Sequence, residues 1–69
     1  MENNIVSKGQ IKFFREEVGY GFITGDDKID TFFHISEFSA GVVPLKGQSV
    51  QYEIIATNKG PKAVKCSLI

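Results

Sequence analysis

The stretch that most constrains the fold of this chain is VGYGFI, residues 18–23. In a β-strand, alternation places Tyr20 and Phe22 on one face, and Gly19 and Gly21 then point to the other. If the rings faced a core, the glycines would lie outside and weaken the strand without any gain in packing. If the rings face outward, the bare inner side lets the strand coil tightly, as a small barrel requires. The stretch therefore predicts a small barrel that exposes aromatic side chains.

A second aromatic run, TFFHI at residues 31–35, follows after a short polar turn. The same alternation places Phe32 with His34 on one face and leaves Phe33 on the other. If this strand pairs with the preceding one in the antiparallel sense, one side of the sheet becomes a ring-lined surface. That surface would consist of Tyr20, Phe22, Phe32 and His34.

Length and charge limit how such a surface can work. The 69 residues form one domain, and a domain this small buries only about 60% of the surface of its unfolded chain. Each large apolar side chain left outside forgoes roughly 1.5 to 3 kcal/mol, so exposed rings need a functional reason. Eight Lys and Arg residues balance eight Asp and Glu residues, and the net charge is zero. Electrostatic attraction of the whole chain therefore cannot be the main argument for binding to nucleic acid. Any basic patch that contacts phosphates has to be local.

The single cysteine, Cys66, excludes an internal disulfide framework and a cysteine-rich zinc site. A single cysteine is typical of a protein in a reducing compartment. We expect its thiol to be packed in the core. The first residues show no basic region followed by an apolar run, and no stretch reaches membrane-spanning length. We therefore expect a soluble, cytoplasmic protein that does not associate with membranes.

Three further segments alternate in the manner of strands, namely residues 9–15, 48–56 and 62–69. With the two aromatic runs they give about five short strands, and no segment carries a helical stripe. We expect an all-β fold, a small five-stranded antiparallel barrel that spans residues 9–69. A short flexible segment, residues 1–8, would precede it.

Alternation also predicts which side chains fill the barrel. In the first strand Ile11 and Phe13 share a face, while Phe14 suits the core and the rim equally well. The inward face of the fourth strand is expected to hold Val50, Tyr52 and Ile54. In the fifth strand one face holds Val64, Cys66 and Leu68. One barrel end is expected to be plugged by Phe38, Val42, Val43 and Leu45.

The motifs GQIKFF, VGYGFI, DTFFHIS, GQSVQYEI and NKGPKA, in this order, resemble the bacterial cold-shock proteins, also called cold-shock domains. The resemblance covers nearly everything after residue 8. It is specific because both of the family's nucleic-acid-binding signature strands are present together. It implies a five-stranded OB-type barrel that binds single-stranded RNA or DNA and acts as an RNA chaperone in the cold-shock response or gene regulation. It also implies that the chain is not an enzyme.

The resemblance further implies which residues contact nucleic acid. The stacking and contact positions of the family fall on Phe13, Tyr20, Phe22, Phe32, His34 and Ile35, and its basic contacts fall on Lys12 and Lys59. Lys62 is a further candidate cation at the edge of the surface. Phe13, Val18 and Lys65 stand where the family usually has Trp, Lys and Asn. The loop that follows Ser36 is about two residues shorter than usual and lacks the exposed aromatic residue that the family often has there.

Two other functions can be weighed against nucleic-acid binding. As a catalytic base or metal ligand, His34 would need partners, and only Asp26, Asp27 and Asp30 lie near it in sequence, where they are more simply turn and loop residues. We therefore expect no catalytic residue, no metal, no cofactor and no small-molecule substrate. A small barrel that binds an extended peptide through the aromatic patch is the alternative. Flat rings beside Lys12 favour a single strand as the ligand, because bases stack on rings and phosphates need nearby cations. We expect the protein to be a monomer.

Overall fold

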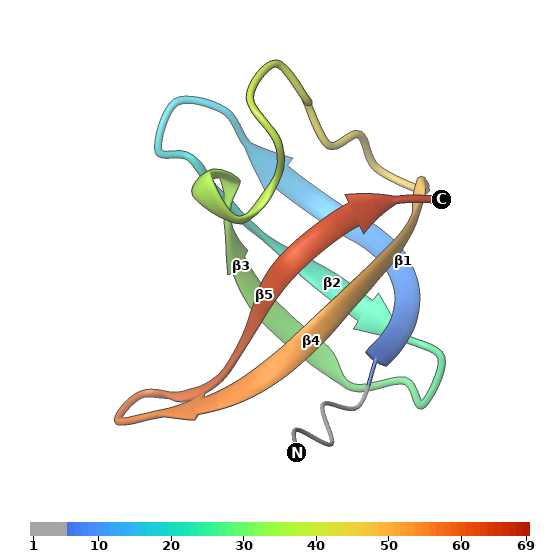
Figure 1. Cartoon of the computed structure of the whole chain (residues 1–69), viewed down its shortest axis with the longest axis vertical. Coiled ribbons are helices and arrows are strands. Elements are labelled where there is room, and N and C mark those ends of the chain that lie inside the picture. The colour runs from blue at the N-terminus through green and yellow to red at the C-terminus, as the bar shows by residue number, and fades with distance from the viewer. Residues whose placement is uncertain (1–5) are drawn as a thin grey trace.

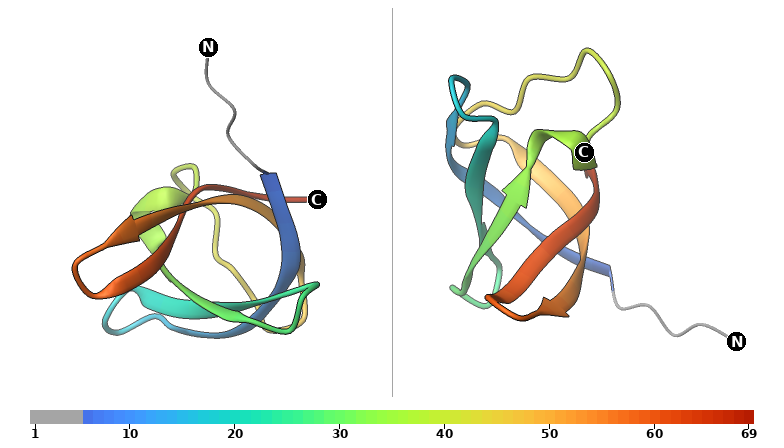
Figure 2. Two further views of the ribbon diagram at one scale, coloured as in Figure 1. Left: turned by 90° about the horizontal axis from the view of Figure 1, so that it is seen from below. Right: turned by 90° about the vertical axis from the view of Figure 1, so that its left-hand side faces the viewer.

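The computed structural model describes residues 6–69, which form five strands and one short 3-10 helix (Figure 1). These elements are β1 (Val6–Arg15), β2 (Tyr20–Gly25), β3 (Asp30–His34), η1 (Ile35–Glu37), β4 (Ser49–Thr57) and β5 (Gly60–Leu68). The strands close into a barrel in the order β1, β2, β3, β5, β4 (Figure 2). The predicted all-β five-stranded barrel is thus confirmed. Its strand contacts are antiparallel except at the closure, where β3 and β5 run parallel and meet at Phe32 and Lys62.

The barrel begins earlier in the chain than the sequence predicted. β1 starts at Val6, and residues 6–8 pair with residues 51–53 of β4. Residues 6–8 thus belong to β1 and not to the expected N-terminal segment, because their backbone pairs with β4. The remainder of the expected N-terminal segment, residues 1–5, lies outside the described part of the chain.

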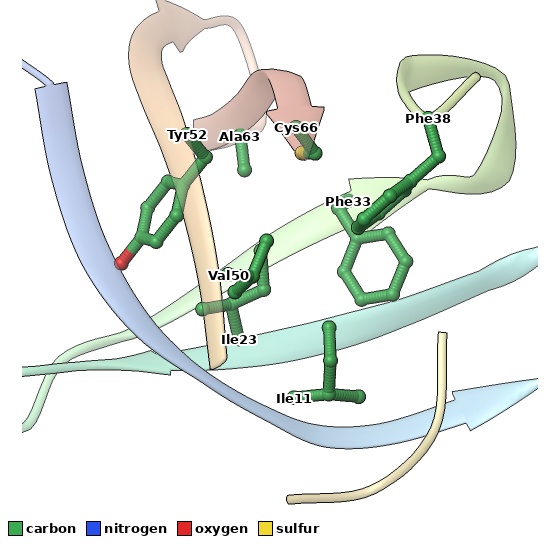
Figure 3. Packing of buried hydrophobic residues seen from close by; sticks show 8 residues of the cluster. All are labelled: Ile11, Ile23, Phe33, Phe38, Val50, Tyr52, Ala63 and Cys66. Atoms are coloured by element: carbon green, nitrogen blue, oxygen red, sulfur yellow. The ribbon is translucent and has the colours of Figure 1, made fainter. Parts of the chain in front are cut away.

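The barrel interior is filled by apolar side chains from all five strands and from the segment after η1 (Figure 3). Phe33 is 0% exposed, as alternation predicts. Its ring stacks on Phe14 at 5.9 Å and meets the edge of Phe38 at 5.4 Å. Phe14, which the sequence left undecided, packs on the core side. The buried set comprises Ile11, Ile23, Phe33, Phe38, Val50, Tyr52, Ala63 and Cys66.

A β-bulge in β1 overturns the expectation that Ile11 and Phe13 share a face. Ile11 lies opposite Ile23, whereas Phe13 lies opposite Phe22, so Lys12 is an extra residue in the ladder. A bulge inserts one residue and shifts the alternation by one position. Ile11 consequently points into the barrel, while Phe13 points out of it.

A second irregularity, in β5, changes the inward face of that strand. The register slips where Lys65 and Cys66 together oppose Tyr52, and Lys65 adopts a left-handed φ of 51°. The predicted face of Val64, Cys66 and Leu68 is therefore wrong in part. Ala63 and Cys66 are buried, whereas Val64 is half-buried and Leu68 is exposed.

The far half of the β4–β5 hairpin extends beyond the barrel (Figure 1). Among the described residues, β1 pairs with β4 only as far as Glu53, so the rest of β4 pairs with β5 alone. Ile54, predicted to be inside, is 44% exposed for this reason. At the other end of the barrel, Phe38 and Val42 pack against the core as expected. Val43 and Leu45 remain exposed, so that part of the predicted plug is wrong.

Candidate functional site

The outer side of β1, β2 and β3 carries two rows of side chains that the strand register aligns. In one row Phe13 lies opposite Phe22, and Phe22 lies opposite Phe32. In the other row Arg15 lies opposite Tyr20, and Tyr20 lies opposite His34. We call the five rings the aromatic face, which consists of Phe13, Tyr20, Phe22, Phe32 and His34.

The rings of the aromatic face contact one another across the strands. The ring centroids of Phe13 and Phe22 lie 5.5 Å apart, those of Tyr20 and Phe32 5.5 Å apart, and those of Phe22 and Phe32 6.0 Å apart. Every ring of the face is half-buried. The neighbouring rings hold one another in place, and each keeps part of its surface open to solvent. Preordered, partly open rings are what stacking on a base requires.

Gly21 lies beneath this surface and allows β1 and β2 to approach closely. A Cβ atom at this position would collide with the carbonyl oxygen of Phe13 and would lie 3.0 Å from the ring of Phe33. The inward-facing glycine predicted from the alternation therefore holds for Gly21. Gly19, in contrast, lies in the turn before β2 with φ of 78°. A Cβ atom there would lie 3.3 Å from Nε2 of His34.

A groove of about 620 Å³ runs between the aromatic face and the β4–β5 turn. Phe22 and Phe32 form part of its lining on one side, and Lys59 and Lys62 contribute cations. The predicted cations Lys59 and Lys62 are thus brought close to two of the predicted stacking rings. The groove is lined by Phe22, Asp30, Phe32, Thr57, Lys59, Pro61 and Lys62.

Lys12, the extra residue of the bulge in β1, is paired with Asp30, which belongs to the groove lining. Its ammonium group lies 2.6 Å from the carboxylate of Asp30, and the hydroxyl of Thr24 donates a hydrogen bond of 2.8 Å to the other carboxylate oxygen. The bonds from Lys12 and Thr24 hold the pKa of Asp30 below its ordinary value. A phosphate that binds Lys12 has to compete with this carboxylate.

Asp30 is a site residue that the sequence analysis missed, since it was read as a loop residue. It is the first residue of β3 and lines the groove. The signal was present in the sequence, because Asp30 is two residues before Phe32 and four before His34. In a strand, that spacing puts all three side chains on the same face.

His34 is held in a defined orientation by the chain that follows it. Its Nδ1 accepts a hydrogen bond of 3.0 Å from the backbone N–H of Ser36, and the ring thereby caps η1. The neutral ring consequently carries its proton on Nε2, which points toward Gly19. Ile35, predicted as a contact residue, packs against the core from η1, and it does not belong to the two aligned rows.

The described residues offer no alternative site for a metal ion. Residues 6–69 contain no group of three His, Cys, Asp or Glu side chains that is suited to hold one. Asp27 accepts a hydrogen bond of 3.0 Å from the backbone of Ile29, which is the turn-forming role that its position indicates. In the same part of the chain, no helix is long and apolar enough to cross a membrane.

Comparison with known proteins gives consistent matches over almost the whole chain. The family described as 'Cold-shock' DNA-binding domain matches residues 7–69. The Cold shock-like protein CspC of Escherichia coli strain K12 is 45% identical over 65 residues, which cover 90% of this chain and 94% of that protein. A Cold shock-like protein of Aquifex aeolicus is 39% identical over 59 residues, which cover 81% of this chain and 84% of that protein.

A solved structure has the same fold. It is that of Drosophila Unr CSD456, and it superimposes with a TM-score of 0.82 at 19% sequence identity. The match covers 97% of this chain and 28% of that longer chain. At this low identity the similarity shows the fold alone.

Proposed function

The chain belongs to the cold-shock DNA-binding domain family, and on that premise we propose that it binds single-stranded RNA or DNA by stacking unpaired bases on the aromatic face. The observation that carries the proposal is the alignment of five half-buried rings on the outside of a barrel this small. In such a small domain, rings that lie outside the core contribute less to the free energy of unfolding than buried rings would, so their position needs a functional reason. The family relationship also means that the chain is a binding domain and not an enzyme.

Stacking supplies most of the binding free energy in this proposal. Base stacking on an aromatic ring contributes about 1 to 3 kcal/mol per base and tolerates most sequences. The lysines beside the face, Lys12, Lys59 and Lys62, neutralise a small number of phosphates. Because only unpaired bases can stack in this way, the protein favours open strands over base-paired ones, which is the action of an RNA chaperone. We infer that it works as a cytoplasmic monomer without a small-molecule substrate.

A titration with short labelled oligonucleotides tests the proposal. A single strand, its complement and the duplex of the two would be compared by fluorescence anisotropy at one salt concentration. Both single strands should bind, and the duplex should bind much more weakly because its bases are already stacked and paired. Equal affinity for the duplex would contradict the proposal.

A second candidate function, binding of an extended peptide, is favoured by one observation. The site includes a groove with Phe22, Phe32 and Pro61 in its lining, and is not flat throughout. Extended or Pro-rich peptides bind in aromatic-lined grooves of this kind. Competition distinguishes the two functions, because an unlabelled Pro-rich peptide should not displace a labelled single strand if nucleic acid is the ligand. Displacement at comparable concentrations would favour the peptide.

A further inference from the structure

Arg15 occupies the sixth place of the two aligned rows, and the other five places are held by rings. It lies on β1 directly opposite Tyr20, which in turn lies opposite His34. Its neighbour in the other row of the same strand is Phe13. Arg15 is the only arginine in the chain. The register therefore places a planar cation at the one position of the two rows that does not hold a ring.

The guanidinium group of Arg15 lies over an aromatic ring. Its central carbon is 5.6 Å from the centroid of the Phe13 ring, within the range of a cation–π contact. The Phe13 ring is itself supported by Phe22 at 5.5 Å. Arg15 is thus in contact with the aromatic face at its β1 edge and does not simply extend into solvent.

The charge of Arg15 is not used for an ion pair within residues 6–69, although Glu16 and Glu17 follow it directly. Other cations around the site are engaged with carboxylates. Lys12 pairs with Asp30 at 2.6 Å, and Lys62 lies 3.9 Å from Glu37. Among the described residues, Arg15 therefore combines a charge that forms no ion pair with a position beside a half-buried ring.

We propose that Arg15 and Phe13 together form one stacking subsite, in which a nucleotide base packs against both the guanidinium plane and the ring at the β1 edge of the aromatic face. The inference rests on the proposed function. The guanidinium group is planar, delocalised and weakly hydrated, and bases of single strands stack on it as they do on aromatic rings. An ammonium group has the same charge but offers no plane. Planarity is therefore the property that separates this role from an ordinary phosphate contact.

The test uses three variants of the full chain, Arg15→Lys, Arg15→Gln and, as a charge control outside the two aligned rows, Lys46→Gln. Arg15 is exposed, and the turn hydrogen bonds from the N–H groups of Val18 and Gly19 are accepted by its backbone carbonyl and not by its side chain. The variants should therefore fold, which circular dichroism verifies. Each is titrated with a single strand at several salt concentrations. The titration is repeated with strands that lack one base, the abasic position being moved along the strand.

We expect Arg15→Lys to weaken binding roughly three- to tenfold, the range of a partly desolvated cation–π contact, while the salt dependence stays that of the wild type. For the strand that lacks the base at this subsite, wild type and Arg15→Lys should bind equally. Lys46→Gln should bind like the wild type. In a Phe13→Leu background the loss caused by Arg15→Lys should shrink, because half of the subsite is already absent.

Two results would overturn the inference and leave the proposed function intact. In one, Arg15→Lys binds like the wild type while Arg15→Gln is weaker with a shallower salt dependence, which identifies a phosphate contact only. In the other, both variants bind like the wild type, which identifies a solvated side chain. Failure of the wild type itself to bind any single strand would instead contradict the proposed function.

Discussion

Adjacent phenylalanines in β3 have opposite roles, and alternation of the strand decides which is which. Phe33 is completely buried between Phe14 and Phe38. Phe32 is half-buried on the outside, in contact with Tyr20 and Phe22. The two side chains have the same composition, so substitution at either one removes the same atoms. We therefore expect substitution of Phe33 to cost stability and, under the proposed function, substitution of Phe32 to cost binding.

The outward rings should be separable from the core by mutation. Tyr20→Ala, Phe22→Ala and Phe32→Ala should each weaken binding of a single strand by roughly 1 to 3 kcal/mol while the barrel stays folded. Phe33→Ala should lower the free energy of unfolding by roughly 3 to 5 kcal/mol, because it leaves a cavity among well-packed rings. Thermal melts and oligonucleotide titrations on the same variants measure both effects. Our assignment of the faces is inverted if Phe22→Ala unfolds the domain and Phe33→Ala only weakens binding.

Cys66 should be chemically inert in the folded protein. It is 5% exposed, and burial, with a smaller effect of Glu37, raises the pKa of its thiol to about 12. The reactive thiolate is therefore almost absent near neutral pH. An aromatic disulfide reagent at pH 8 should label Cys66 far more slowly in buffer than in urea, which serves as the control. Equal rates in the two solvents would show that the β5 irregularity does not bury this side chain.

At the level of elements, the sequence predicted the strands well and the irregularities poorly. Period-2 alternation located all five strands and the correct orientation of the rings in β2 and β3. It failed at Phe13 and Val64 because each lies beside a register slip, and a bulge is set by pairing with the neighbouring strand. The placement of Phe13 at the site came from the family resemblance and not from alternation.

Other misplacements arise from tertiary structure that local patterns do not contain. Ile54 alternates correctly with Tyr52, but the barrel ends before reaching it, and so it is exposed. Asp30 was missed for a different reason, since its chemistry suggested a loop although its spacing from Phe32 indicated the face. The pairing of Lys12 with Asp30 across β1 and β3 then became visible only in three dimensions.

The irregularity in β5 includes backbone strain at Lys65 that a substitution should relieve. Lys65 has φ of 51°, a left-handed conformation that costs most residues roughly 1 to 2 kcal/mol and that Asn adopts more readily. Its ion pair with Glu53 is long, at 4.0 Å, and the Lys65 side chain is exposed, so loss of the pair should matter little. Lys65→Asn should therefore raise the free energy of unfolding by about 0.5 to 1 kcal/mol in urea denaturation. The bond from its backbone N–H to Glu37 is retained in the variant.

Lys65→Gln is the matched control for that experiment, because it makes the same change of charge with a residue that does not favour left-handed φ. Its stability should stay within about 0.5 kcal/mol of the wild type. If Asn stabilises the barrel no more than Gln does, the backbone at residue 65 is not strained.

For the whole molecule, the charge balance leads us to expect only a small electrostatic contribution to the proposed binding of nucleic acid. The net charge is zero, and Lys12, Lys62 and Lys65 each lie within ion-pair distance of a carboxylate. Long-range attraction of a polyanion is accordingly weak. Under the proposed function, we therefore expect binding to depend on contact with the bases, and its electrostatic part to be confined to a few phosphates near the groove.

The salt dependence of binding should be shallow. Two or three neutralised phosphates imply a slope of roughly −1.4 to −2.1 in a plot of log K against log salt concentration for single strands. Titrations of the wild type at four or more salt concentrations provide the slope. A slope steeper than about −4 would mean that more phosphates are neutralised than this surface can contact. Stacking would then not be the main contribution to the binding free energy.

The central claim, that bases stack on the outer face of the barrel, can be tested with the intrinsic fluorescence of the protein. The chain has no Trp and two Tyr residues, so its emission comes from Tyr20 and Tyr52. Tyr20 lies on the aromatic face at 5.5 Å from Phe32, whereas Tyr52 is 2% exposed inside the barrel. A base that stacks on the face should therefore quench Tyr20 and leave Tyr52 unaffected.

Addition of an unlabelled single strand should lower the tyrosine emission of the wild type and of Tyr52→Phe. Tyr20→Phe keeps a ring for stacking, so it should still bind in an assay with a labelled strand, but its own emission should no longer respond. The result that would contradict the claim is an emission of Tyr20→Phe that still falls on binding, together with an emission of Tyr52→Phe that no longer changes. In that case the ligand lies near Tyr52, and the aromatic face is not where bases stack.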